Sequence, residues 1–108
     1  MSIYTRRIVG PAILAAATEV VWTCPANTSA VIRNVLLVNS NTAVAGVIRV
    51  GIGGTTNATR FLRVGLPVAT SSQYDIRVAM TEGEELWAYS DTNPSVSITV
   101  TAFVFDDP

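Results

Sequence analysis

The chain has 108 residues, enough for one domain with a single hydrophobic core, and a net charge of −1 with a sequence pI of about 5.1. That charge excludes the basic field that attracts nucleic acid, and the absence of histidine excludes Ser-His-Asp and Cys-His catalysis and histidine-ligated zinc. Hydrophobic residues make up 49% of the chain and charged residues only 14%. So few charged residues cannot cover the surface of a small domain, and the apolar patches that stay exposed usually mark subunit contacts.

The N-terminal segment begins with an Arg6-Arg7 pair and an apolar run, which imitates a short signal peptide, but Gly10-Pro11 interrupts that run. We therefore expect a soluble chain that keeps this segment and spans no membrane. Residues 1–17 are predicted to form an extended N-terminal arm or an edge strand that reaches a neighbouring subunit, because their apolar side chains need cover. We predict Ile8 and Ile13 as contact residues of this segment; its other apolar side chains are Ile3, Tyr4, Val9 and Leu14.

β-Branched residues and apolar alternation dominate the rest of the chain, and no long window shows helical spacing. The predicted strands are residues 20–23, 29–39, 44–52, 59–64, 72–78, 85–90 and 95–105. Turns rich in Gly, Pro, Asn and Asp separate them, about every 8–12 residues, which is typical of sandwiches and jelly rolls. The predicted fold is all-β: a single antiparallel β-sandwich, jelly-roll-like, with an extended N-terminal arm, in one domain over residues 1–108.

Residues 29–39 and 44–52 predict a hairpin about a polar turn near Thr42. With symmetric pairing, one face is a core face made of Ile32, Leu36, Val38, Ile48, Val50 and Ile52 beside Asn34. The other face mixes aliphatic side chains with two arginines. A subunit interface would bury the aliphatic side chains and neutralise the arginine charges. We predict a contact there through Arg33, Val35, Leu37, Val47 and Arg49, next to Val31. An ordinary exposed sheet face is the alternative, and a one-residue slip would exchange the two faces.

The last strand alternates regularly. Its predicted core residues are Val96, Ile98, Val100, Ala102 and Val104. Phe103 and Phe105 fall on the opposite face among hydroxyl side chains, so we predict that they contact another subunit or are covered by the N-terminal segment.

No motif predicts a catalytic, cofactor or metal site. Cys24 is the single cysteine and is expected to be a buried thiol. The glycines at 51–54 fit a turn and no phosphate-binding motif, and the glutamates at 82–85 fit a solvated turn. Trp22, Trp87 and Tyr89 could form a sugar-stacking platform, although aromatic residues on strands are more often core or interface anchors.

Residues 21–35, VWTCPANTSAVIRNV, resemble an opening seen in small virion proteins of tailed bacteriophages. Those proteins read aromatic-Thr-apolar-Pro-Ala-Gly-Lys-Thr before a long apolar strand, and Asn27-Thr28 departs from their Gly-Lys. Residues 82–88 are similar to their late turn and residues 95–104 to their last strand. The resemblance implies a virion component with a jelly-roll-like sandwich, in a capsid decoration or a tail role.

From these features we expect a non-enzymatic bacteriophage virion structural protein: a capsid decoration or cement protein that binds the outer shell as an oligomer, such as a trimer. Its expected partners are copies of itself and the major capsid protein or other virion subunits, without cofactor, nucleic acid or membrane. Its expected location is the virion, assembled in the host cytoplasm. A minor tail or fibre-associated protein is one alternative, and a carbohydrate-binding module is an alternative of another class.

Overall fold

Eight β-strands make up the computed structural model, which describes residues 2–53, 60–91 and 95–106. No helix occurs among these residues, which confirms the predicted all-β class. The strands are β1 (Ser2–Ile13), β2 (Glu19–Thr23), β3 (Thr28–Asn39), β4 (Gly46–Ile52), β5 (Arg60–Leu66), β6 (Thr70–Met80), β7 (Glu85–Ser90) and β8 (Val96–Asp106).

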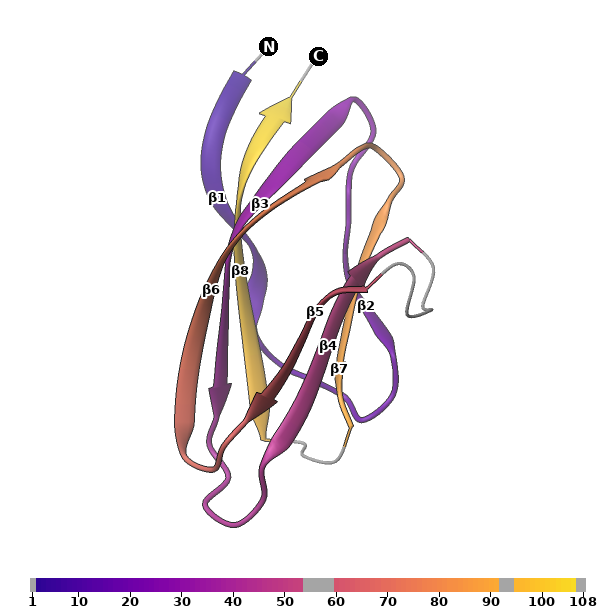
Figure 1. Ribbon diagram of the computed structural model, residues 1–108. Helices are drawn as coiled ribbons and strands as arrows, with labels where there is room; N and C mark the ends of the chain where they lie inside the picture. Colours follow the sequence, from indigo (N-terminus) through magenta and orange to yellow (C-terminus); the bar gives the residue numbers. More distant parts are fainter. Residues whose placement is uncertain (1, 54–59, 92–94, 107–108) are drawn as a thin grey trace.

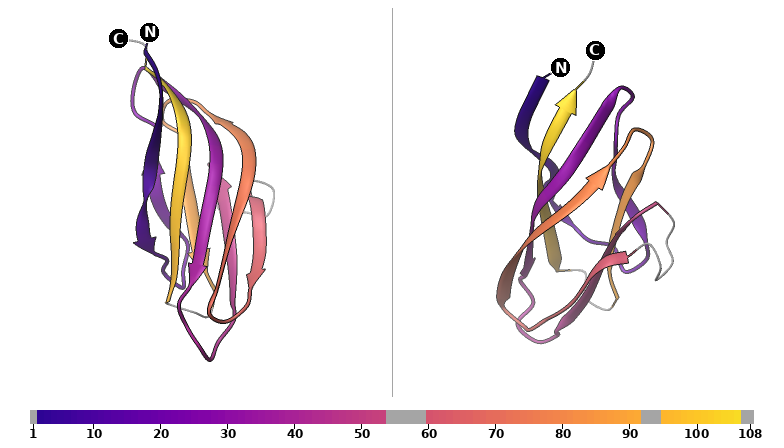
Figure 2. Two further views of the ribbon diagram at one scale, coloured as in Figure 1. Left: turned by 90° about the vertical axis from the view of Figure 1, so that its left-hand side faces the viewer. Right: turned by 45° about the horizontal axis from the view of Figure 1, so that its top comes forward.

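The strands form two four-stranded antiparallel sheets that pack face to face (Figure 1). Sheet A has the order β1-β8-β3-β6 and sheet B the order β2-β7-β4-β5. Consecutive strands lie in opposite sheets, except β4 and β5, so nearly every connection crosses between the layers. This strand order is the jelly-roll-like sandwich that the sequence predicts. The molecule is long and narrow, with extents of 47 × 25 × 18 Å (Figure 2).

The core lies between the two sheets and is lined by alternate residues of each strand. Strand β8 shows the rule most clearly, because the five aliphatic residues predicted to be buried all face the interior: Val96, Ile98, Val100, Ala102 and Val104. Sheet B supplies the opposing layer through Ile48, Val50 and Leu86. The predicted core of the last strand is therefore confirmed.

The predicted hairpin of residues 29–39 with 44–52 is wrong. Strand β3 pairs with β6 and β8, whereas β4 pairs with β5 and β7 in the other sheet. Apolar alternation cannot separate these cases, since both strands bury one side whether they lie side by side or face each other. The connection crosses the sandwich and is held by Asn39, whose side-chain amide donates to the carbonyls of Val44, Leu66 and Pro67.

The register of β3 also shifts between Ile32 and Asn34, relative to both neighbouring strands. Ile32 and Val35 both face the interior, so the two residues between them, Arg33 and Asn34, both lie on the outer side. Beyond this bulge the faces are the reverse of the predicted ones. Val35 and Leu37 have no exposed surface and belong to the core, so their prediction as contact residues is wrong, and Leu36 and Val38 lie outside instead.

Residues 2–13 form the edge strand β1, paired with β8 from Ser2 opposite Asp106 to Ile13 opposite Ser97. Two register shifts bend this strand, and the first places both Ile8 and Val9 in the interior. The prediction of Ile8 as a contact residue is therefore wrong. Gly10 has a φ of 76° and lies so close to β8 that a Cβ atom there would be 2.1 Å from the Ile98 carbonyl oxygen.

Candidate interaction surface on sheet A

The outer face of sheet A is a broad surface that no other part of the described chain covers (Figure 2, left). Residues directly opposite each other in antiparallel strands share a face, so the register defines rows across the sheet. One row holds Val31, Phe103 and Thr5, and the next holds Phe105 and Ile3. Together these rows place four apolar side chains at the end of the sheet that carries the chain termini. We call this cluster the upper patch: Ile3, Val31, Phe103 and Phe105.

A second apolar cluster lies at the other end of the same face. Val38, Ser97 and Ile13 share a row, and Leu36 lies opposite Thr99 in the row before it. Ile13 is 65% exposed, the highest value among the large hydrophobic side chains described, and Leu36 and Val38 are half-buried. We call this cluster the lower patch: Ile13, Leu36 and Val38.

Polar side chains separate the two patches. Asp75, Asn34, Thr101 and Arg7 form one row across all four strands. The Asn34 amide donates to Asp75 Oδ1 over 3.0 Å. The β3 bulge also places Arg33 on the outer face, next to Asn34. Arg77 of β6 lies on the same face, so the two arginines are neighbours across the sheet.

These residues surround a shallow hollow of about 210 Å³, lined by Arg33, Asp75, Ile76 and Arg77. Arg33 also lies over the Phe103 ring, with its Cζ atom 4.5 Å from the ring centre. In the part of the chain that the structure describes, neither Arg33 nor Arg77 forms an ion pair. The hollow therefore presents two guanidinium groups and one carboxylate, that of Asp75, so its net charge is positive. Together with the adjacent apolar patch, this excess positive charge suits a carboxylate on a protein surface.

The predicted contact residues are divided between the two sheets. Arg33, Phe103 and Phe105 lie on the outer face of sheet A, with Ile13, whereas Val47 and Arg49 lie on the outer face of sheet B. Arg49 forms an ion pair with Asp91, and this bond raises the pKa of the guanidinium. Sequence reasoning missed Arg77 and Asp75, although the alternation of Ser71, Gln73, Asp75 and Arg77 with less polar residues marks them as one face of β6.

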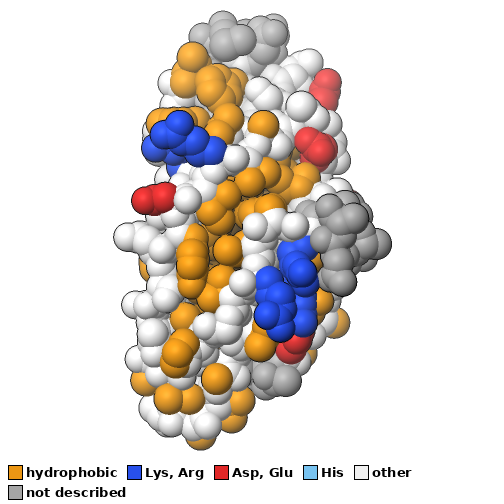
Figure 3. All heavy atoms as spheres, in the orientation of Figure 1, with side chains coloured by type: hydrophobic (Ala, Val, Ile, Leu, Met, Phe, Trp, Pro, Cys, Tyr) orange, Lys and Arg blue, Asp and Glu red, His pale blue; other side chains and the backbone are white. Residues whose placement is uncertain are grey.

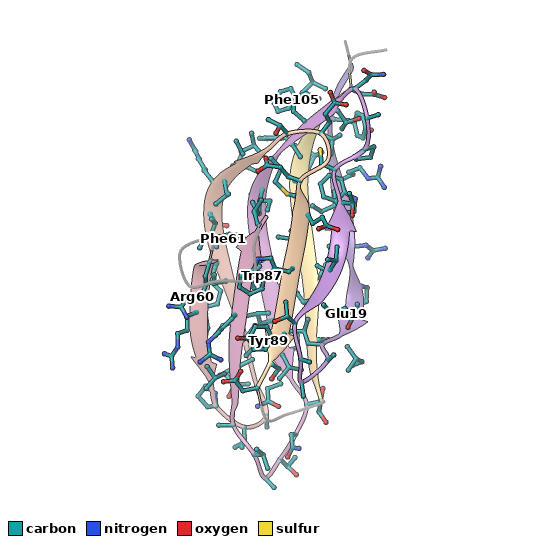
Figure 4. All side chains as sticks on the ribbon, turned by 90° about the vertical axis from the view of Figure 1, so that its right-hand side faces the viewer. Glu19, Arg60, Phe61, Trp87, Tyr89 and Phe105 are labelled. Atoms are coloured by element: carbon teal, nitrogen blue, oxygen red, sulfur yellow. The ribbon has the colours of Figure 1, made fainter. Side chains whose placement is uncertain are left out.

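The aromatic residues of sheet B do not form an open sugar-stacking platform. Trp87 and Tyr89 are stacked along β7, with ring centres 6.0 Å apart (Figure 4). Trp87 is only 1% exposed, and the face of Tyr89 is occupied by Arg49, whose Cζ lies 5.6 Å from the ring centre. Trp22 lies opposite Leu86, a core residue. These rings are therefore packing residues of sheet B.

Cys24 is a buried thiol, as predicted, and its Sγ donates to the Thr28 carbonyl over 3.3 Å. Burial, followed by the negative charges of Glu84 and Glu82, raises the pKa of the thiol. Among the residues described, no three His, Cys, Asp or Glu side chains gather as metal ligands would. No helix in the described chain is long and apolar enough to cross a membrane.

No protein-family model and no curated protein matches the sequence. Among solved structures, a chain of Bacillus endospore appendages, which form disulfide-linked pili, matches with a TM-score of 0.58 and 9% identity, over 99% of this chain and 90% of that chain. A chain of infectious bursal disease virus, Gx strain, matches with a TM-score of 0.51 and 10% identity, over 95% of this chain and 31% of that one.

A pentameric capsid protein from metagenomic phage sequences has 14% identity over 96% of this chain and 58% of its own length, but its TM-score of 0.32 is too low to carry an argument. At the identities of the two nearer structures, the similarity shows a shared β-sandwich fold alone.

Proposed function

We propose that the protein is a non-enzymatic structural subunit of a bacteriophage virion, a capsid decoration or cement protein that binds the outer shell as an oligomer. The observation that carries this proposal is the outer face of sheet A, where the upper and lower patches flank an arginine-lined hollow. Seven apolar side chains on one face are the composition of an interface with other protein subunits.

The size of this face supports the proposal. Four strands about 4.8 Å apart and about eleven residues long cover on the order of 700 Å². Stable protein interfaces bury about 800 Å² on each partner. One such contact is therefore near the lower end of stable association, and repetition over a symmetric shell would supply the rest of the binding energy.

Composition, resemblance and fold support the same class of function. The chain has few charged residues, and its sequence resembles small virion proteins of tailed bacteriophages at residues 21–35, 82–88 and 95–104. Two solved structures with a similar sandwich come from assemblies, a pilus and a virus. A jelly-roll sandwich with two broad faces is a suitable building block for such particles.

Quantitative mass spectrometry of purified virions tests the proposal. A phage carrying this coding sequence is propagated and banded on a density gradient, and copies of the protein are counted against the major capsid protein. We expect hundreds of copies per particle. A handful of copies would instead support the minor tail or fibre-associated role, and absence from the particle would overturn a virion function of either kind.

A further inference from the structure

Negative charge is concentrated at one end of the molecule, in the turn between β6 and β7. Glu82, Glu84 and Glu85 lie within four residues there, and in the described chain none of them forms an ion pair. In Figure 3, acidic side chains lie near the upper end, and arginine side chains gather in two groups, one over each sheet, each with an acidic side chain close by. Every copy thus carries an acidic end, and on sheet A it carries two arginines, Arg33 and Arg77, that form no ion pair within the described chain.

The acidic turn is held rigidly by the neighbouring turn between β2 and β3. The Asn27 backbone N–H donates to Glu82 Oε2 over 3.0 Å, and the Cys24 N–H donates to the Glu84 carbonyl over 2.9 Å. The Gly83 N–H donates back to the Cys24 carbonyl over 2.9 Å. We call residues 24–27 and 81–85 together the acidic tip. Because its backbone is fixed before any contact forms, little conformational entropy would be lost on binding.

We propose that the hollow on sheet A receives the acidic tip of a second copy of the chain. This inference rests on the proposed function, since it names the partner of the same sheet A surface. Arg33 and Arg77 supply two guanidinium groups, and Glu85, exposed on the tip, supplies a carboxylate that pairs with no cation among residues 2–53, 60–91 and 95–106. Pro25 and Ala26 are exposed on the same tip and add apolar surface to it, as the upper patch adds apolar surface next to the hollow.

The two surfaces of this contact are different patches of the chain, so the contact is heterologous. Each copy would offer its tip to one neighbour and its hollow to another. A rotation that closes gives a ring, and one that does not gives an open series of subunits. Both outcomes repeat one contact many times, as a shell or fibre requires.

Sedimentation velocity with charge-exchange variants tests this contact. Arg77→Glu places like charges against the tip of a neighbour, and Glu85→Arg places like charges against the hollow. Like charges brought together at an interface repel each other, so we expect each variant alone to self-associate at least about tenfold more weakly than the wild type. An equimolar mixture should restore association, because each variant then meets its opposite charge. Arg63→Glu, an exposed arginine on sheet B, is the matched control and should associate like the wild type.

Circular dichroism is the control that each variant is folded. Sedimentation of the wild type at about 50 mM and about 500 mM NaCl should show weaker association at the higher concentration, because salt screens the charges. Failure of the mixture to restore association, or equal weakening by Arg63→Glu, would overturn the tip-in-hollow contact. If Leu36→Asp in the lower patch still abolished association in that case, the proposed structural function would stand while this inference would not.

Discussion

The guanidinium group of Arg33 lies over the ring of Phe103, 4.5 Å from its centre, and joins the hollow to the upper patch. The two residues come from adjacent strands, β3 and β8, and both were predicted from sequence as contact residues. Such a cation–π contact contributes about 0.5–1 kcal/mol at an exposed site. Its main consequence here is positional, because the ring holds the guanidinium at the rim of the hollow.

Replacing Phe103 separates the contribution of its ring from that of its apolar surface. We expect Phe103→Ser to weaken self-association about tenfold or more, since it removes apolar surface from the upper patch and releases Arg33. Phe103→Leu keeps apolar surface without the ring, and it should retain most of the association. Sedimentation equilibrium measures both. Equal association of the serine variant and the wild type would show that Phe103 lies outside the contact.

Leu36 and Leu37 are adjacent in β3 but lie on opposite sides of sheet A. Leu37→Asp buries a carboxylate among Val35, Ile98 and their neighbours, which costs several kcal/mol and should abolish folding. Leu36→Asp places the same group on the outer face, where it should leave the fold intact and abolish self-association. Circular dichroism and thermal melting distinguish them. A folded Leu37→Asp protein would contradict the assignment of faces that follows from the β3 bulge.

Asn39 fixes the crossing between β3 and β4. It is 1% exposed, and its amide donates to the carbonyls of Val44, Leu66 and Pro67, so Asn39→Ala leaves buried acceptors unsatisfied. We expect a loss of about 3 kcal/mol in the free energy of unfolding, measured by urea denaturation. Asn41→Ala, which removes a more exposed acceptor for the N–H groups of Ala43 and Val44, is the control and should cost about 1 kcal/mol. Equal losses would contradict this role.

The raised pKa of Cys24 predicts slow alkylation and a stability that depends on pH. The folded state holds the thiol proton more tightly than the unfolded state does. Its contribution to stability is present below the ordinary thiol pKa of about 8.5 and is lost as the pH rises through the raised folded value. We expect iodoacetamide to label the native thiol far more slowly than the denatured one. Cys24→Ala should remove this part of the alkaline decline in stability, whereas an unchanged decline would assign it to other groups.

The fold class and the last strand could be predicted from sequence because alternation along β8 reports burial directly. The pairing of β3 could not, since the same alternation fits a strand beside β4 and a strand facing it across the core. The contact residues were predicted only in part. One register shift, at Arg33 and Asn34, reverses the sides of Val35 and Leu37, and no single-residue signal in the sequence marks that shift.

Residues from distant strands could be grouped only once the register was available. Phe103 was predicted to lie on an outer face, but its neighbours Val31 and Ile3 come from β3 and β1. The hollow likewise joins β3 to β6, which lie about forty residues apart in the chain. Sequence patterns give the side on which a residue lies, whereas the strand order decides which residues meet there.

Hydroxyl-radical footprinting with mass spectrometry tests the central claim most directly, because it reports which side chains lose solvent exposure on assembly. Assembled protein is compared with dilute, dissociated protein of the same sequence. We expect Phe103, Phe105 and Leu36 on sheet A to be protected on assembly, while Phe61 and Tyr89 of sheet B keep the same reactivity. Protection confined to sheet B, or unchanged reactivity of all three sheet A residues, would contradict the account.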